Sequence, residues 1–134
     1  MNESGARLEG GCLCGQVRYS TPGLPTYAGN CHCRDCQRAV GAGFVTWFGV
    51  KPEDFSVLEG TITQCETSPG VRRGFCAVCG TSLTYEGDDW DDVAITAASL
   101  DDPSKIIPES NVFLSHKQPW VIADLSLRNY DGFP

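Results

Sequence analysis

The sequence predicts a mainly β fold of short antiparallel strands with very little helix. Three observations support this prediction. Turn residues recur at short intervals, the segments between them are rich in β-branched and aromatic residues, and eight cysteines fall mostly in short-range groups. The length of 134 residues lies within the usual size of one domain, so we expect residues 1–134 to form a single domain.

The expected strands follow one another along most of the chain. Turns rich in proline and glycine, such as residues 21–23 and 68–70, separate them. Short extended runs at such intervals, without long helical segments between them, favour antiparallel pairing over βαβ units. The predicted strands are residues 15–20, 44–50, 61–66, 81–85, 93–97 and 111–114.

Helix is expected at two places only. Residues 34–40, directly after a group of cysteines, form the better candidate, with about two turns at most. A second turn of helix is expected at residues 103–107. The predicted core is therefore small and lies mainly between strands.

The charge balance and the hydropathy pattern exclude several classes of partner. Ten Lys and Arg residues against 17 Asp and Glu residues give a net charge of -7, and an acidic surface repels nucleic acids. The longest mainly apolar run, residues 40–50, contains three glycines and is too short to span a bilayer. Residues 1–11 lack the apolar core of a secretory signal. We expect a cytoplasmic protein with no nucleic-acid or membrane partner.

The cysteines are the strongest chemical signal in the sequence. Cytosolic thiols are kept reduced, so metal binding explains eight cysteines better than a disulfide framework does. Neighbouring cysteines are poor partners in one disulfide, but their spacing suits ligands of one tetrahedral ion. We therefore expect a zinc-stabilised domain. The cysteines are Cys12, Cys14, Cys31, Cys33, Cys36, Cys65, Cys76 and Cys79.

Four of these cysteines are expected to form a closed zinc site. Cys76 and Cys79 have the spacing of a zinc knuckle, and Cys12 and Cys14 would present both sulfurs on one face of a strand. A glycine follows each pair and would relieve the backbone there. Four thiolates leave no position for a substrate. This site would join segments more than sixty residues apart and so contribute to folding.

Three other cysteines are expected to form a second, open zinc site. Cys31, Cys33 and Cys36 lie within one short segment and would occupy three corners of a tetrahedron. Three protein ligands with a free fourth position are typical of a catalytic zinc. We therefore predict that these three cysteines form the catalytic site.

A fourth protein ligand would make this second site structural instead. His32 lies between two ligands, and in a strand its side chain would point to the opposite face. Cys65 has no neighbouring ligand and receives no role here, since a lone cysteine is usually a small buried apolar residue. His116 stands alone near the end of the chain. We expect the open site, with closure by one of these three residues as the alternative.

The chemistry of an open three-thiolate site favours a thiol as its ligand. Three thiolates bring the charge of the zinc site to about −1, so it is a weak Lewis acid and hydrolysis is not expected. A soft fourth ligand is favoured, and a thiol with a free pKa of about 8.5 would lose its proton on binding. Glutathione is the abundant small thiol of the cell.

Arginines near the cysteines are candidates for holding the two carboxylates of glutathione. Arg34 and Arg38 lie beside the Cys31 group, and Arg72 and Arg73 precede the Cys76 pair. A guanidinium can bind a carboxylate through two parallel hydrogen bonds. For any one of them, an exposed surface charge with no binding role is the alternative. We predict that Arg34 and Arg38 contribute to glutathione binding.

Several segments carry a resemblance to a known family. They are GGCLCGQVRY at residues 10–19, CHCRDC at 31–36 and GFCAVCGT at 74–81, with GAGF at 41–44, SLDDP at 99–103 and PW at 119–120. In this order they resemble the glutathione-dependent formaldehyde-activating enzyme family, to which the centromere protein V domain also belongs. The resemblance covers a motif-bearing part of about residues 8–121.

The resemblance implies a mainly β fold with two zinc ions per chain, one structural and one more weakly held. It implies an S-(hydroxymethyl)glutathione synthase, formally a carbon–sulfur lyase acting in reverse, that condenses formaldehyde with glutathione. The expected partners are glutathione and a small aldehyde, and a homodimer is compatible with the sequence. By resemblance, the structural ligands are Cys12, Cys14, Cys76 and Cys79, and the glutathione site is formed by Cys31, Cys33 and Cys36.

A function without catalysis is the main alternative. The likeness to the centromere protein V domain suggests a zinc-binding module that recognises another protein. A carrier of glutathione is a second non-catalytic alternative, because formaldehyde adds to glutathione without an enzyme. Trp47, Trp90 and Trp120 would suit such an interface if exposed, whereas buried they would pack in the core. A third hypothesis is redox or metal handling, with the Cys31 group as a reactive thiol cluster.

Overall fold

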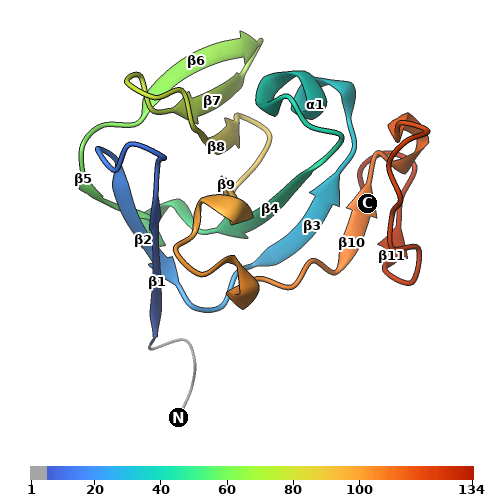
Figure 1. Ribbon diagram of the computed structural model, residues 1–134, viewed down its shortest axis with the longest axis horizontal. Helices are drawn as coiled ribbons and strands as arrows, with labels where there is room; N and C mark the ends of the chain where they lie inside the picture. The colour runs from blue at the N-terminus through green and yellow to red at the C-terminus, as the bar shows by residue number, and fades with distance from the viewer. Residues whose placement is uncertain (1–5) are drawn as a thin grey trace.

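The computed structural model describes residues 6–134, which form a mainly β structure with two sheets (Figure 1). These residues contain eleven strands and one α-helix, which confirms the predicted fold class. The strands are β1 Arg7–Gly11, β2 Arg18–Pro22, β3 Tyr27–Cys31, β4 Val45–Val50, β5 Ser56–Glu59, β6 Thr63–Ser68, β7 Val71–Phe75, β8 Ser82–Gly87, β9 Val93–Thr96, β10 Ser110–Val112 and β11 Arg128–Asn129.

The smaller sheet has the order β1-β2-β5, and all its pairs are antiparallel. β1 and β2 form a hairpin whose connecting turn contains Cys12 and Cys14. β5 pairs with the outer side of β2, and the register shifts between Arg18 and Tyr19. This hairpin brings the first cysteine pair against the larger sheet, where the second pair lies.

The larger sheet has the order β11-β10-β3-β4-β9-β8-β7-β6. From β3 to β6 every pair is antiparallel, as the sequence predicts, but β10 runs parallel to both β3 and β11. The reason is a crossover: β9 and β10 point the same way, so residues 97–109 carry the chain back across the sheet before β10 begins (Figure 1).

The larger sheet buries side chains on both faces. On β4, Phe48 and Val50 point into the main core, whereas Val45 and Trp47 belong to a second apolar cluster. This alternation follows from the two-residue period of a strand. The main core contains Cys12 and Cys76, and the second cluster contains Cys31 and Cys36. Each cysteine group is therefore built into a different apolar cluster.

The α-helix α1 spans Arg34–Val40, as predicted. It begins after Cys33, whose sulfur accepts a hydrogen bond from the backbone N–H of Cys36 at 3.2 Å, and it ends where the N–H of Gly41 donates to Gln37 O. The expected turn near residue 103 is a short 3-10 helix at Pro103–Lys105. No helix in the described part of the chain has the length and apolarity needed to cross a bilayer.

Candidate metal centres and the adjoining pocket

Four cysteines form the first candidate metal centre, named here the four-sulfur cluster. Cys12 and Cys14 come from the β1–β2 turn, and Cys76 and Cys79 come from the β7–β8 turn. The Cys14 sulfur lies 3.6 Å from that of Cys12 and 3.8 Å from that of Cys76. In a zinc tetrathiolate with Zn–S bonds of about 2.3 Å, neighbouring sulfurs are about 3.8 Å apart. The sulfur geometry therefore fits a tetrahedral metal ion.

The structure corrects one detail of the sequence analysis. Cys12 and Cys14 do not lie on one face of a strand, because β1 ends at Gly11 and β2 begins at Arg18. Both cysteines are in the turn between these strands. The turn directs both sulfurs to the same side by curving the backbone, rather than by strand alternation.

The two turns of the four-sulfur cluster close in the same way. The N–H of Gly15 donates to Cys12 O at 3.1 Å, and the N–H of Gly80 donates to Cys76 O at 2.7 Å. The φ angles of Gly15 and Gly80 are 83° and 80°, in the left-handed region that glycine adopts without a Cβ clash. The predicted need for glycine after each cysteine pair is confirmed.

Hydrogen bonds to the four-sulfur cluster stabilise thiolates. The Thr81 hydroxyl accepts the N–H of Leu13 at 3.0 Å and lies 3.2 Å from the Cys79 sulfur, so it connects the two turns. Hydrogen bonds from the Thr81 side chain and backbone lower the pKa of Cys79 to about 5. The Cys12 sulfur accepts the N–H of Val17 at 3.2 Å. The turns thus supply donors that favour charged sulfur at Cys12 and Cys79, and charged sulfur is the form that binds metal.

Three cysteines form the second candidate centre, named here the three-sulfur cluster. Cys31 is the last residue of β3, Cys33 caps α1, and Cys36 lies in the first turn of that helix. Their sulfurs lie within 4.8 Å of one another. The change from strand to helix within one short segment is what brings them together, since each element presents its sulfur from a different direction.

None of the three alternative ligands joins the three-sulfur cluster. Cys65 is exposed on β6. His32 is buried and its Nε2 lies 3.4 Å from Asn111 Oδ1. His116 lines the cavity beside the cluster but is outside the group of mutually close sulfurs. Among residues 6–134, no fourth Cys, His, Asp or Glu donor completes this cluster within the same 4.8 Å.

An arginine places positive charge beside the three-sulfur cluster. Arg73 Nη2 lies 3.7 Å from the Cys36 sulfur, and the guanidinium carbon lies 4.9 Å from the centre of the Tyr85 ring. Hydrogen bonds with Cys31 and Cys33, and then the charge of Arg73, lower the pKa of Cys36 to about 3. Arg73 therefore favours the thiolate form of Cys36, the sulfur that it contacts.

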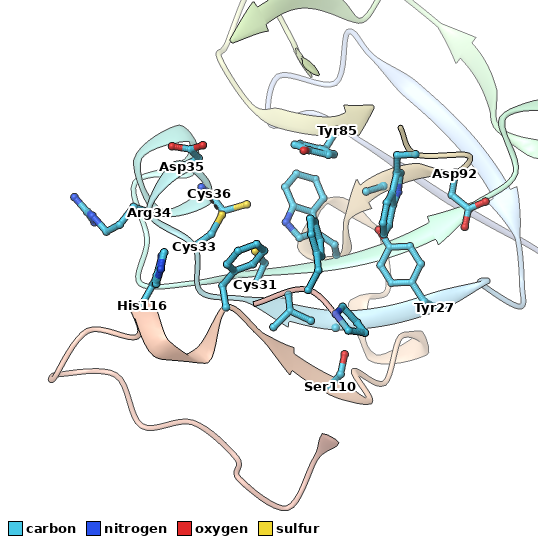
Figure 2. Close-up of a pocket in the computed structure, with 18 of the residues that line it drawn as sticks. Tyr27, Cys31, Cys33, Arg34, Asp35, Cys36, Tyr85, Asp92, Ser110 and His116 are labelled. Carbon is cyan, nitrogen blue, oxygen red and sulfur yellow. Dashed lines mark hydrogen bonds between the residues drawn. The ribbon is translucent and has the colours of Figure 1, made fainter. Parts of the chain in front are cut away.

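A cavity of about 590 Å³ adjoins the three-sulfur cluster, and the three cysteines form part of its wall (Figure 2). Two strands, β3 and β4, and the start of α1 build the floor near the cysteines. Trp47, 6% exposed, packs there against Tyr85 with ring centres 6.0 Å apart. Six aromatic side chains line the cavity: Tyr27, Trp47, Tyr85, Trp90, Phe113 and Phe133.

Comparison with known proteins identifies the family of this chain. The family model described as "Glutathione-dependent formaldehyde-activating enzyme" matches residues 7–116, which contain both sulfur clusters. The chain belongs to this family. A Halomonas elongata protein named "Putative glutathione-dependent formaldehyde-activating enzyme" is 32% identical over 142 residues, an alignment that covers 95% of this chain and 88% of that protein.

One solved structure resembles the fold over most of its length. A crystal structure of a Rhodobacter sphaeroides protein has a TM-score of 0.63 to this chain, covering 92% of this chain and 99% of that one. The sequences are 19% identical, so this likeness shows a shared fold alone.

Four arginines are candidates for binding the carboxylates of glutathione, and all four lie within the residues matched by the family model: Arg34, Arg38, Arg72 and Arg73. Arg34 and Arg73 line the large cavity. Arg38 lines a smaller adjoining hollow, which also touches Arg73. Arg72 instead pairs with Asp88 at 2.9 Å. The structure thus brings Arg34 to the cavity beside the cysteines, adds Arg73, and leaves Arg38 next to that cavity.

Most of the side chains that form the cavity wall could not be identified from the sequence. Tyr27, Trp90, Phe113 and Phe133 come from separate elements, so no sequence period connects them. The expected strand at 111–114 also ends early, at Val112. Phe113 follows with a φ of 54°, a left-handed conformation that is rare for aromatic residues and leaves no mark in the sequence.

Proposed function

We propose that this member of the glutathione-dependent formaldehyde-activating enzyme family is a zinc-dependent carbon–sulfur lyase-type enzyme that joins glutathione to an aldehyde. The activity is that of an S-(hydroxymethyl)glutathione synthase when the aldehyde is formaldehyde. One observation carries this proposal: a three-sulfur cluster, to which no described residue adds a fourth donor, forms part of the wall of a cavity of ligand size. A purely structural metal site needs no such cavity.

The cysteines would hold two zinc ions per chain. Sets of sulfur donors at tetrahedral spacing suit zinc, and the four-sulfur cluster encloses its ion completely. The three-sulfur cluster leaves one direction for a ligand. When bound there, zinc favours the thiolate form of a thiol at neutral pH.

The reaction itself is an addition without change of oxidation state. The glutathione sulfur attacks the carbonyl carbon, a sulfur–carbon bond forms, and one bond of the C=O group breaks. The proton that the thiol gives up ends on the new hydroxyl oxygen, so no further reactant is needed. His116 lines the cavity, and its imidazole would pass this proton between sulfur, solvent and oxygen.

Two arginines in the cavity would orient glutathione. Arg73 contacts Cys36, whereas Arg34 lines the cavity with its guanidinium turned away from the cysteines and donating to Gln37 Oε1, so Arg34 would turn toward a bound ligand (Figure 2). A guanidinium binds a carboxylate in a fixed geometry. Arg73 contacts Cys36 and stacks over Tyr85, so its charge would stabilise negative charge on the oxygen of an aldehyde bound beside this sulfur. Aromatic walls exclude water, which strengthens both electrostatic contacts.

Native mass spectrometry and NMR exchange spectroscopy together test this function. We expect two zinc ions per chain, glutathione binding, and exchange between free glutathione and its formaldehyde adduct that is faster than the uncatalysed reaction. Cys33→Ala should lose glutathione binding and the acceleration. Cys65→Ala is the matched control, because it removes an exposed cysteine outside both clusters.

The opposite result would favour a non-catalytic module. Two firmly held zinc ions, with no glutathione binding and no acceleration of adduct exchange, would overturn the proposal. Loss of binding in both Cys33→Ala and Cys65→Ala would also contradict it, because the effect would not then depend on the three-sulfur cluster.

A further inference from the structure

The cavity has the size that a glutathione adduct requires. Its volume of about 590 Å³ lies in the range of roughly 300–1,000 Å³ that encloses drug-sized ligands. Formaldehyde adds one carbon and one oxygen to the glutathione sulfur. The lining of the cavity indicates which part would hold glutathione and which part would hold the group attached to its sulfur.

The cationic side chains of the cavity gather at the cysteine end. Arg34, Asp35 and His116 lie beside the three cysteines, whereas Tyr27 and Ser110 lie at the opposite end (Figure 2). The cations needed to hold the carboxylates of glutathione are thus all near the sulfurs. Glutathione is expected to occupy this end of the cavity.

None of the described residues that line the opposite end is a cation that could bind a carboxylate. Asp92 lines this end, where it pairs with Lys51 Nζ at 3.1 Å and accepts the hydroxyl of Thr26 at 2.6 Å. The Lys51 charge is already paired with Asp92, and the Asp92 carboxylate would repel a carboxylate of glutathione. Glutathione is therefore not expected to extend in this direction.

A set of aromatic rings in contact with one another lines the cavity and includes Tyr27 at this end. The ring of Trp90 stacks on Phe133 with centres 5.6 Å apart and meets Tyr27 edge-on at 5.7 Å. Phe113 meets Phe133 edge-on at 4.9 Å. These four residues, named here the aromatic chamber, all line the cavity. Such a surface favours stacking with an aromatic or other apolar group.

The backbone holds one ring of the aromatic chamber in an unusual conformation. Phe113 has a φ of 54°, and its N–H donates to Gly132 O at 3.0 Å. Side chains larger than those of glycine and asparagine seldom occupy this region, and residues that do cluster at ligand sites. The arrangement places the Phe113 ring against Phe133 instead of in the strand alternation of β10.

We propose that the aromatic chamber binds an aromatic or similarly bulky apolar substituent on the aldehyde carbon, so that aromatic aldehydes are preferred over formaldehyde. This inference rests on the proposed function, because it assigns the group attached to the glutathione sulfur. The bonds change as for formaldehyde: the sulfur–carbon bond forms, one C=O bond breaks, and the thiol proton moves to oxygen. The product is a thiohemiacetal whose substituent lies against Trp90 and Phe133.

Binding of two stable thioethers tests the chamber without requiring catalysis. Isothermal titration calorimetry on the zinc-loaded protein would compare S-benzylglutathione with S-methylglutathione, which differ only in the group attached to sulfur. We expect the benzyl compound to bind at least tenfold more tightly, since burying a phenyl ring is worth roughly 10- to 100-fold in affinity. Equal affinities, or no binding of either thioether, would overturn the inference.

Two variants assign the preference to the chamber. Phe133→Ala and Trp90→Ala should each reduce the benzyl-to-methyl affinity ratio about tenfold; Phe133 is 60% exposed, so its truncation is compatible with folding. Trp120→Ala is the matched control, because Trp120 is 71% exposed and does not line the cavity. An unchanged ratio in Phe133→Ala would contradict the assignment.

The proposed function has a separate readout in the formaldehyde exchange experiment. If that exchange is accelerated but the two thioethers bind with equal affinity, the proposed role of the aromatic chamber is refuted and the proposed enzyme activity is supported. If the protein prefers the benzyl compound, loses this preference in Phe133→Ala and accelerates no aldehyde exchange, the binding role of the aromatic chamber is supported and the proposed catalysis is refuted.

Discussion

The Cys76→Ala substitution removes one sulfur from the cluster that joins two distant turns. Cys76 is 1% exposed in the main core, and its cluster connects the β1–β2 turn to the β7–β8 turn. The comparable substitution at the second centre is Cys36→Ala, which removes a sulfur that is 4% exposed. Both changes delete one buried sulfur, so the difference between them isolates the effect of the connection.

The size of this effect follows from the length of chain that each cluster closes. Cys14 and Cys76 are 62 residues apart. A crosslink over that distance lowers the entropy of the unfolded chain and so raises the free energy of unfolding by about 4 kcal/mol. For a chain of 134 residues this corresponds to about 14 °C in Tm. The three-sulfur cluster closes only residues 31–36, so Cys36→Ala should cost about 1 kcal/mol of packing, or about 4 °C.

Thermal unfolding followed by circular dichroism would measure these shifts on zinc-loaded protein. Cys65→Ala should leave Tm within about 2 °C of the wild type, because the side chain is exposed and outside both clusters. A strong chelator should lower the Tm of the wild type toward that of Cys76→Ala. Equal shifts in Cys76→Ala and Cys36→Ala, or a wild-type Tm indifferent to the chelator, would refute the reasoning.

Three further predictions concern residues around these centres. Thr81→Val should weaken metal binding at the four-sulfur cluster about tenfold in a chelator competition, because Thr81 supports Cys79 and Leu13. Burial raises the pKa of Tyr19 to about 12, so the folded state keeps its phenol neutral and loses stability as the pH rises from about 10 to 12. In Tyr19→Phe, the decrease of Tm over this pH range should be smaller than in the wild type. Asn111→Ala should speed amide hydrogen exchange at Tyr130 at least tenfold. The Asn111 side chain donates to Asp124 O and to Asn129 Oδ1, at 2.9 Å each, and so positions its own backbone carbonyl, which accepts the N–H of Tyr130.

Local features of this fold could be predicted from the sequence. The bounds of α1 follow from residues within the helix and at its ends, where Cys33 caps the first turn and Gly41 follows the last. The turns after Cys14 and Cys79 require the glycine that stands there. In each case the interactions that decide the structure lie within a few residues of one another.

Features that depend on distant neighbours could not be predicted in this way. β3 has the sequence YAGNC, with two small residues and an asparagine, and it forms a strand because β4 and β10 pair with its two edges. β7 contains Arg72 and Arg73 but is held between β6 and β8. The aromatic chamber has the same origin, since Tyr27 and Phe133 meet Trp90 only after the sheet has formed.

The spacing of cysteines along the chain determines what each cluster can contribute. A cluster whose ligands are far apart in sequence stabilises the fold each time it binds metal, so exchanging one of its ligands would loosen two distant segments together. A cluster within residues 31–36 connects no distant segments, and its strand and helix are held by sheet pairing and by capping of α1. Such a cluster can gain and lose a fourth ligand without unfolding the chain. The three-sulfur cluster is therefore the one suited to ligand exchange, and the cavity lies beside it.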